Sequence, residues 1–173
     1  MDFSKSIKSS IVNNKLIKKG ERVGVAVSGG VDSMCLLYAF LKLKNEFDLS
    51  LFALHFEHGI RGEDSVNDAR FIKETCETLE IEYVMGKGDV PKIAEEKKQS
   101  IETAARNARY SFFESATKKY KLDKIALAHH LDDQAETIIL NLVRGSGTKG
   151  LTAMKDFRKP NYIRPMLSIL KTD

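Results

Sequence analysis

Short apolar runs alternate with longer segments of helical periodicity along this chain, and that alternation limits the folds it can adopt. Strands are expected at residues 23–27, 49–56, 81–85 and 124–128, and helices at residues 32–47, 64–79, 100–121 and 131–143. A repeated strand–helix–strand order favours a mostly parallel sheet with helices on both faces. Continuous apolar strands are typical of such doubly covered sheets. We therefore predict an α/β, Rossmann-like fold, with ligands bound at the carboxyl ends of the strands.

The composition is that of one globular domain. The chain has 173 residues, of which 42% are hydrophobic and 30% charged, enough for a single core. No apolar run approaches the ~20 residues that span a bilayer. Residues 1–20 are lysine-rich, with Phe3, Ile7 and Ile11 at a spacing of four, which predicts an amphipathic helix and not a secretory signal. We expect a cytoplasmic protein without a membrane partner.

The cysteines and the charges limit the possible functions less than the strand–helix pattern limits the fold. Cys35 and Cys76 form no Cys-x-x-Cys pair, so no zinc or iron–sulfur site is indicated. Both fall on the apolar side of expected helices, and we predict that both pack in the core. The net charge of +4 is compatible with a polyanionic partner. Basic residues near the N-terminus fit either a solvated helix face or a nucleic-acid patch: Lys5, Lys8, Lys15, Lys18, Lys19 and Arg22.

Residues 28–33, Ser-Gly-Gly-Val-Asp-Ser, lie between the first expected strand and helix. The glycines permit a tight turn with close backbone approach to a ligand, and the helix N-terminus adds unpaired N–H donors. The serine hydroxyls are further donors to phosphate oxygens. Asp32 is suited to capping the helix or to holding Mg²⁺ against phosphates. An ordinary strand-to-helix turn is the alternative, and the segment is neither a Walker A loop nor a dinucleotide fingerprint.

Histidines and carboxylates gather at two other expected strand ends. His55, His58, His129 and His130 fit a metal site less well than helix caps or strand-end contacts. A spacing of four places His129 and Asp133 on one helix face if helical geometry begins at the strand end. Such a pair beside a phosphate loop orients a nucleophile or moves a proton. Capping of the helix by Asp132 or Asp133 is the alternative.

Arg106 and Arg109 share a face of the helix expected over residues 100–121. Surface ion pairs with Glu102 or Glu114 are one interpretation. Stabilisation of negative charge on a phosphate or a transition state is the other. Arg144 and Lys149 lie in a glycine-rich segment that we interpret as a loop over substrate or against RNA phosphate.

Residues 28–33 resemble the phosphate loop of the N-type ATP pyrophosphatases, the PP-loop superfamily with its adenine nucleotide alpha hydrolase-like fold. Four more segments resemble tRNA(Ile)-lysidine synthases in the order of that family: residues 55–62 (His-Phe-Glu-His-Gly-Ile-Arg-Gly), 102–110, 128–137 and 164–167 (Arg-Pro-Met-Leu). The resemblance spans about residues 23–170. It implies that ATP is held by Ala26, Ser28, Gly29, Gly30, Val31, Asp32 and Ser33, with Mg²⁺ on Asp32. It places the reaction near Asp32, Arg106, Arg109, His129 and Asp133.

The resemblance also implies a ligase forming a carbon–nitrogen bond. In that family ATP adenylylates the wobble cytidine of tRNA(Ile) with a CAU anticodon, and free L-lysine then displaces AMP. We expect residues 1–173 to be one PP-loop domain, cut before C-terminal tRNA-binding domains, and a homodimer is compatible with the sequence. The alternatives are another tRNA-modifying PP-loop enzyme, or a fragment that binds ATP or tRNA but is inactive alone.

Overall fold

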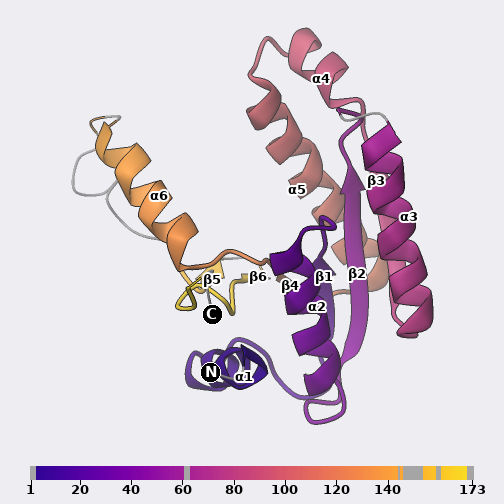
Figure 1. The fold of residues 1–173 in the computed structure, drawn as a ribbon, viewed down its shortest axis with the longest axis vertical. Coiled ribbons are helices and arrows are strands. Elements are labelled where there is room, and N and C mark those ends of the chain that lie inside the picture. Colours follow the sequence, from indigo (N-terminus) through magenta and orange to yellow (C-terminus); the bar gives the residue numbers. More distant parts are fainter. Residues whose placement is uncertain (1–2, 61–62, 144, 146–153, 159–160, 171–173) are drawn as a thin grey trace.

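The computed structural model describes residues 3–60, 63–143, 145, 154–158 and 161–170. Its elements follow the predicted alternation of strands and helices (Figure 1). In chain order they are α1 (Phe3–Asn13), β1 (Arg22–Ala26), α2 (Val31–Leu43), β2 (Ser50–Glu57), α3 (Glu63–Thr78), β3 (Glu82–Lys87), α4 (Val90–Glu96), α5 (Ile101–Tyr120), β4 (Lys124–Ala126), α6 (Leu131–Val143), β5 (Phe157–Arg158) and β6 (Tyr162–Ile163).

One twisted sheet has the strand order β3-β2-β1-β4-β6-β5. All neighbours are parallel except β5 and β6, which are antiparallel. Val25 of β1 lies between Ala53 of β2 and Ala126 of β4. The chain runs outward from β1 to β3 and then returns to the other side of β1, so the strand order reverses between β1 and β4. Crevices at such reversals are where α/β sheets bind ligands.

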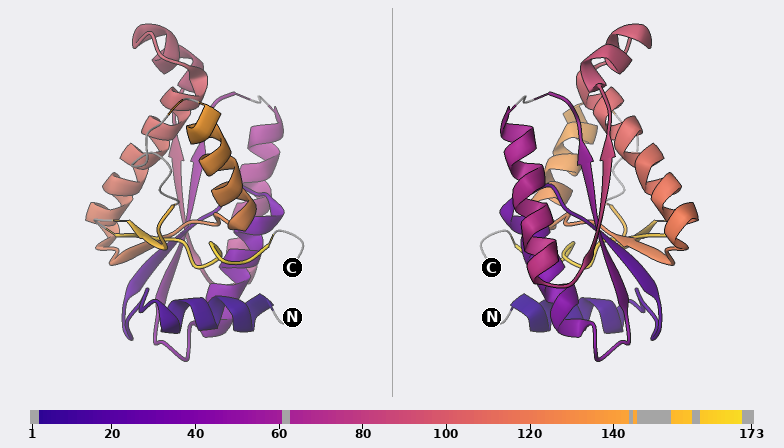
Figure 2. Two further views of the ribbon diagram at one scale, coloured as in Figure 1. Left: turned by 90° about the vertical axis from the view of Figure 1, so that its left-hand side faces the viewer. Right: turned by 90° about the vertical axis from the view of Figure 1, so that its right-hand side faces the viewer.

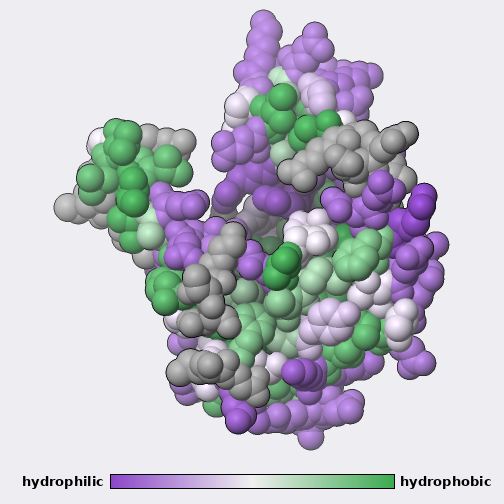
Figure 3. Space-filling model, in the orientation of Figure 1, coloured by the Kyte–Doolittle hydropathy of each residue, from purple (hydrophilic) through white to green (hydrophobic). Residues whose placement is uncertain are grey.

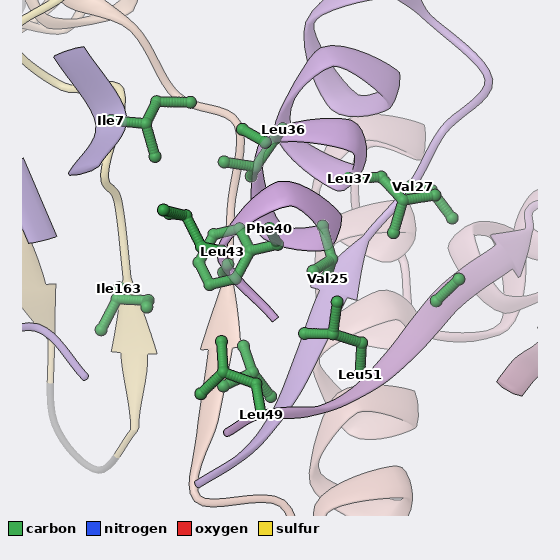
Figure 4. Packing of buried hydrophobic residues seen from close by; sticks show 14 of the residues in the cluster. Ile7, Val25, Val27, Leu36, Leu37, Phe40, Leu43, Leu49, Leu51 and Ile163 are labelled. Atoms are coloured by element: carbon green, nitrogen blue, oxygen red, sulfur yellow. The ribbon is translucent and has the colours of Figure 1, made fainter. Parts of the chain in front are cut away.

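Helices cover both faces of the sheet, as predicted (Figure 2). On one face, α1, α2 and α3 pack a core around Phe40, Leu36 and Val25, each fully buried, and Figure 4 shows how their side chains meet. On the other face, Phe113 of α5 packs against Ile125 and its neighbours. None of the described helices is both long and apolar enough to cross a membrane.

Local signals explain where several elements begin and end. The Ser100 side chain accepts the Thr103 N–H at 3.2 Å, which caps α5 as predicted. The amino-terminal helix is confirmed, with Ile7 and Ile11 buried. The short helix α4 was not predicted, although Asp89 caps it by accepting the Lys92 N–H at 3.1 Å. Strands β5 and β6 were also missed, because two residues each give no detectable periodicity.

The two cysteines do not share one environment. Cys76 is fully buried in α3, as predicted. Cys35 is exposed, so the prediction that it packs in the core is wrong. Its neighbours Met34 and Leu36 are both buried, because the buried stripe of this apolar helix passes on either side of position 35 and leaves it at the solvent side.

Candidate active site

A cavity of about 460 Å³ opens where β1, β2 and β4 end. Its walls come from these strand ends, from the loop before α2, and from α3 and α5. The lining residues are Ala26, Val27, Ser28, Ser33, Leu54, His55, Phe56, Glu57, His58, Ile60, Ser65, Asp68, Ala105, Arg109, Tyr110, Phe113, Leu127, Ala128 and His129. The predicted residues Ala26, Ser28, Ser33, Arg109 and His129 are thus brought together in one cavity.

The loop between β1 and α2 has the backbone geometry of an anion site. Gly29 has φ +87°, a region that disfavours any side chain, and an added Cβ would lie 3.4 Å from Cγ of Asp68. Gly30 is the N-cap of α2 in extended geometry, and no side chain caps the helix. The first turn of α2 therefore keeps backbone donors and a positive dipole end for an anion.

The hydroxyl oxygens of the two serines of the loop lie 3.2 Å apart and are hydrogen-bonded to each other. Ser33 is buried, and its hydroxyl donates to the Gly30 carbonyl at 2.9 Å. Its oxygen also accepts the Ser28 N–H at 3.1 Å. Ser33 therefore stabilises the turn, and because it also lines the cavity, its contact with a phosphate stays a prediction. Ser28 is exposed at the cavity, and its contact with a phosphate likewise stays a prediction.

Asp32 lies in the first turn of α2 without capping it. The cap position is Gly30, and no side chain makes a cap hydrogen bond there, so the capping alternative for Asp32 does not hold. Its Oδ2 lies 3.8 Å from Nε2 of His130. In the described part of the chain, no three His, Cys, Asp or Glu side chains form a metal-ligand group. One carboxylate beside a phosphate loop suits Mg²⁺, which commonly takes one or two carboxylates plus substrate phosphates.

His130 is buried at the end of β4 among carboxylates. Its Nδ1 lies 3.6 Å from Asp132 Oδ2 and 3.5 Å from Asp133 Oδ2. The His130 N–H donates to the same Asp133 oxygen at 2.8 Å. Because His130 precedes α6, this bond is half of a capping box. The capping interpretation of Asp133 is therefore confirmed. The cap uses Oδ2 of Asp133 and not its second oxygen, Oδ1.

His129 is held by an arginine that was not among the predicted site residues. Arg164 Nε donates to His129 Nδ1 at 3.2 Å. Burial and then the charge of Arg164 lower the pKa of His129 to about 4, with Arg109 and Arg106 acting in the same direction and Asp133 opposing them. Helix α6 begins only at Leu131, so the condition for a shared helix face of His129 and Asp133 is not met, although the charge of Asp133 acts on the His129 ring.

Arg106 and Arg109 take different positions on α5. Arg109 lines the cavity, whereas Cζ of Arg106 lies 5.4 Å from the centre of the Tyr110 ring, a cation–π contact. Neither arginine forms an ion pair with Glu102 or Glu114 among the described residues. The surface ion-pair interpretation is not supported, and of the two arginines it is Arg109 that lines the cavity.

His55 lies in β2 and His58 follows that strand, and His55 makes a strand-end contact of the predicted kind. The Nδ1–H of His55 donates to the Val27 carbonyl at 3.0 Å, joining β2 to the end of β1. Burial, Arg109 and His55 lower the pKa of His58, in that order of importance. Both line the cavity. Each residue is therefore part of the wall that joins the two strands.

Three acidic or basic residues of the site were missed at the sequence level. Glu57 is buried in the cavity wall and pairs with Lys87 at 3.2 Å, and Asp68 of α3 faces Gly29. Arg164 is 4% exposed, follows β6, and also donates from Nη1 to the Lys155 carbonyl at 2.8 Å. In the sequence, a charged residue in or next to an apolar strand indicates such a site. Only the strand order of the sheet shows which strand ends lie side by side. Arg144 and Lys149, predicted to form a loop, lie outside the described residues.

Comparison with known proteins agrees with this geometry. A family model of the ATP-binding PP-loop domain matches residues 2–173. The chain belongs to the PP-loop family. Membership implies an ATP-binding domain, and residues 28–33, which the sequence predicts to be its phosphate loop, are called the PP loop.

Two relatives show which PP-loop proteins this domain is similar to. It is 45% identical over 164 residues to the tRNA(Ile)-lysidine synthase of Clostridium acetobutylicum, covering 95% of this chain and 36% of that protein. It is 38% identical over 173 residues to the tRNA(Ile)-lysidine synthase of Clostridioides difficile, covering 100% of this chain and 37% of that protein. This PP-loop domain therefore spans little more than a third of the length of these relatives.

A solved structure confirms the fold. The U34-tRNA thiolase NcsA from Methanococcus maripaludis, with its [4Fe-4S] cluster, has a TM-score of 0.80 at 21% identity, covering 98% of this chain and 59% of that one. At this identity the likeness concerns the PP-loop fold alone.

Proposed function

We propose that this chain is the ATP-binding domain of a tRNA(Ile)-lysidine synthase, a ligase that joins free L-lysine to the wobble cytidine of tRNA(Ile) with a CAU anticodon. The similarity to relatives of that name is the observation that carries the proposal. A PP loop beside a cavity lined by His129 and Arg109 supports it. A cytoplasmic location and a homodimer stay predictions of this proposal.

ATP is proposed to lie with its phosphates against the PP loop and its adenosine in the cavity. The backbone N–H group of Gly29, the N-terminus of α2 and the Ser28 hydroxyl suit the phosphates. Ala26 and Leu54 give an apolar wall suited to the adenine ring. Mg²⁺ bound by Asp32 would neutralise phosphate charge.

In the first proposed step, O2 of the cytidine attacks the α-phosphorus of ATP. A bond forms between O2 and phosphorus, the bond to the β-phosphate oxygen breaks, and pyrophosphate leaves. Arg109 lines the cavity and Arg106 lies one turn away on α5. Their positive charges are suited to the developing negative charge on the phosphates, so positioning and electrostatics carry this step.

In the second proposed step, the lysine ε-amine attacks C2 of the adenylylated cytidine and AMP leaves with the C2–O2 bond broken. The amine must first lose a proton, because an unperturbed lysine has a pKa of about 10.4. Asp133 and His129 are the candidate bases. Asp133 is partly exposed at the start of α6, with one oxygen bound to the His130 N–H, and its charge also suits the lysine ammonium.

Another PP-loop tRNA-modifying enzyme is the second candidate, favoured by the fold likeness to a thiolase. Sulfur transfer needs reactive or cluster-binding cysteines. Cys35 is exposed on α2, whereas Cys76 is buried in α3 with its pKa raised to about 11 by burial. These two residues do not form the thiol set that sulfur transfer requires.

The deciding experiment is ATP-dependent incorporation of radiolabelled lysine into a tRNA(Ile) transcript with a CAU anticodon. The matched control is the same transcript with a GAU anticodon. The assay uses both this chain and the protein extended to the length of its relatives. Incorporation into the CAU transcript alone supports the proposal. Its absence with both proteins, in assays where the Clostridium acetobutylicum enzyme is active, overturns it.

A further inference from the structure

We propose that Arg164 is a positioning residue that holds His129 with its proton on Nε2, so that His129 donates a hydrogen bond to a phosphate oxygen of ATP instead of taking the proton of the lysine amine. The assignment of the ligand rests on the proposed function. The assignment of the proton rests on the contacts of His129 alone.

The hydrogen bond between the two side chains fixes which ring nitrogen is protonated. Arg164 Nε lies 3.2 Å from His129 Nδ1. A guanidinium nitrogen has a proton to donate and no lone pair to accept with, so Nδ1 must be the acceptor. A neutral imidazole with an unprotonated Nδ1 has its proton on Nε2. To act as a base through Nε2, the ring would need its proton on Nδ1, where it would meet the arginine N–H.

Arg164 is placed rigidly enough to impose this choice. It is 4% exposed, and its Nη1 donates to the Lys155 carbonyl at 2.8 Å. Its backbone N–H donates to the Asp156 carbonyl at 2.7 Å, which fixes the main chain of Arg164 beside residues 155–156. The guanidinium makes two side-chain hydrogen bonds, one to the Lys155 carbonyl and one to the His129 ring. These two bonds hold the guanidinium in place against Nδ1 of His129.

The charges around His129 favour a neutral donor. Arg164, Arg109 and Arg106 all oppose protonation of the ring, and Asp133 alone favours it. The ring lines the cavity next to Ala128 and Arg109. Within the described part of the chain, no hydrogen bond is formed by Nε2. A neutral N–H donor beside cationic arginines is an arrangement that stabilises an oxyanion.

The proton position is tested directly by nuclear magnetic resonance on the chain labelled with ¹⁵N-histidine. Long-range proton–nitrogen correlations distinguish a protonated from an unprotonated ring nitrogen, and the His129 signals are assigned by their loss in His129→Gln. At pH 7 we expect His129 to carry its proton on Nε2. A proton on Nδ1 would overturn the proposal whether or not the chain is active.

The ligand is tested on the same sample with a non-hydrolysable ATP analogue. We expect the Nε2–H signal of His129 to shift on binding while Nδ1 stays unprotonated. Binding that leaves this signal unchanged overturns the assigned donor role. Absence of ATP binding overturns the proposed function and the ligand together, and the proton position found without ATP still decides the role of Arg164.

Substitutions separate a donor from a base in the lysine-incorporation assay. His129→Gln places an amide N–H near the position of Nε2, whereas His129→Asn places one near Nδ1. A donor role predicts that kcat/KM for His129→Gln stays within about tenfold of wild type, and that His129→Asn and His129→Ala lose about a hundredfold. Equal losses in all three variants would contradict the donor role.

Arg164 is tested with Arg164→Met and Arg164→Lys, and Arg70→Met on the exposed side of α3 is the matched control. In Arg164→Met we expect both ring tautomers, a His129 pKa shifted upward from about 4, and a new loss of activity below about pH 6.5. Arg164→Lys keeps the charge and reports the effect of the guanidinium geometry if the methionine variant does not fold. A folded Arg164 variant with a wild-type tautomer and pH profile would refute the positioning role.

Discussion

Nε2 of His130 and Oδ2 of Asp32 lie 3.8 Å apart, which joins the start of α6 to the first turn of α2. The two residues come from elements on either side of the reversal between β1 and β4. His130 is buried, so the imidazole limits where the Asp32 carboxylate can move. The position of the Asp32 side chain therefore depends on the segment between β4 and α6 as well as on its own helix, α2.

Replacement of Asp32 should affect the use of Mg-ATP. We expect Asp32→Asn to lower kcat/KM for ATP about tenfold or more, because an amide does not neutralise the cation as a carboxylate does. The measurement is the rate of ATP-dependent lysine incorporation as a function of Mg²⁺ concentration. Asp48→Asn, the same change in an exposed turn, is the control. Unchanged Mg²⁺ dependence in Asp32→Asn would remove the metal role from this residue.

A methyl group at Gly29 should impair ATP binding more than stability. Gly29 has φ +87° and Gly20 has φ +83°, so alanine at either position costs about 1–2 kcal/mol of backbone strain. The two positions differ in surroundings, because Gly20 has nothing within 4 Å of an added Cβ. We expect similar losses of unfolding free energy for Gly29→Ala and Gly20→Ala, but weaker ATP binding by calorimetry only for Gly29→Ala. Equal ATP affinity in the two variants would show that the nucleotide does not bind against the PP loop.

The stability of the chain should fall in mildly acidic solution. The pKa of His129 is lowered from 6.5 to about 4 in the folded chain, so the unfolded chain binds a proton first as the pH falls. Folding is unaffected by this group above pH 6.5 and loses up to about 3 kcal/mol as the pH falls toward 4. Chemical unfolding at several pH values measures the effect. His129→Gln should show a smaller decline than wild type between pH 6.5 and 4.

Thiol reactivity should distinguish the two cysteines. Cys35 is exposed, whereas Cys76 is fully buried with its pKa raised to about 11. A thiol reagent at pH 8 should modify Cys35 rapidly, and should reach Cys76 only after denaturation. Mass spectrometry of the modified peptides gives the order. Rapid labelling of Cys76 in the folded chain would show that α3 does not pack as described.

The fold was predictable because its strands and long helices carry strong local signals. The run at residues 23–27, the Ser100 cap and the helix at residues 131–143 follow from apolar periodicity and capping chemistry, and the structure places them within a few residues of the prediction. Strands β5 and β6 were not predictable in this way. Their pairing depends on β4, a long-range contact that leaves no periodic pattern in two residues.

The candidate site was predictable in its loop and less so in its contacts. Residues 28–33 carry the chemistry of an anion site in their own sequence, so the loop was predictable as part of the candidate site, and the structure places it beside the cavity. The hydrogen bond from the Ser33 hydroxyl to the Gly30 carbonyl was not predicted, because it depends on the geometry of the turn. Arg164 and His129 are 35 positions apart and meet only through the neighbouring strands β4 and β6. Spacing rules apply within one helix or one strand, so they do not predict a contact between residues that follow two different strands.

Helix α6 has no buried residue and stands away from the sheet (Figure 1). Its apolar side chains gather at one end of the molecule in the space-filling view (Figure 3). Ile139 and Leu142 are more than half exposed, yet the same helix begins at the His130–Asp133 cap beside Asp32. One continuous helix thus carries exposed apolar side chains along its length and site carboxylates in its first turn.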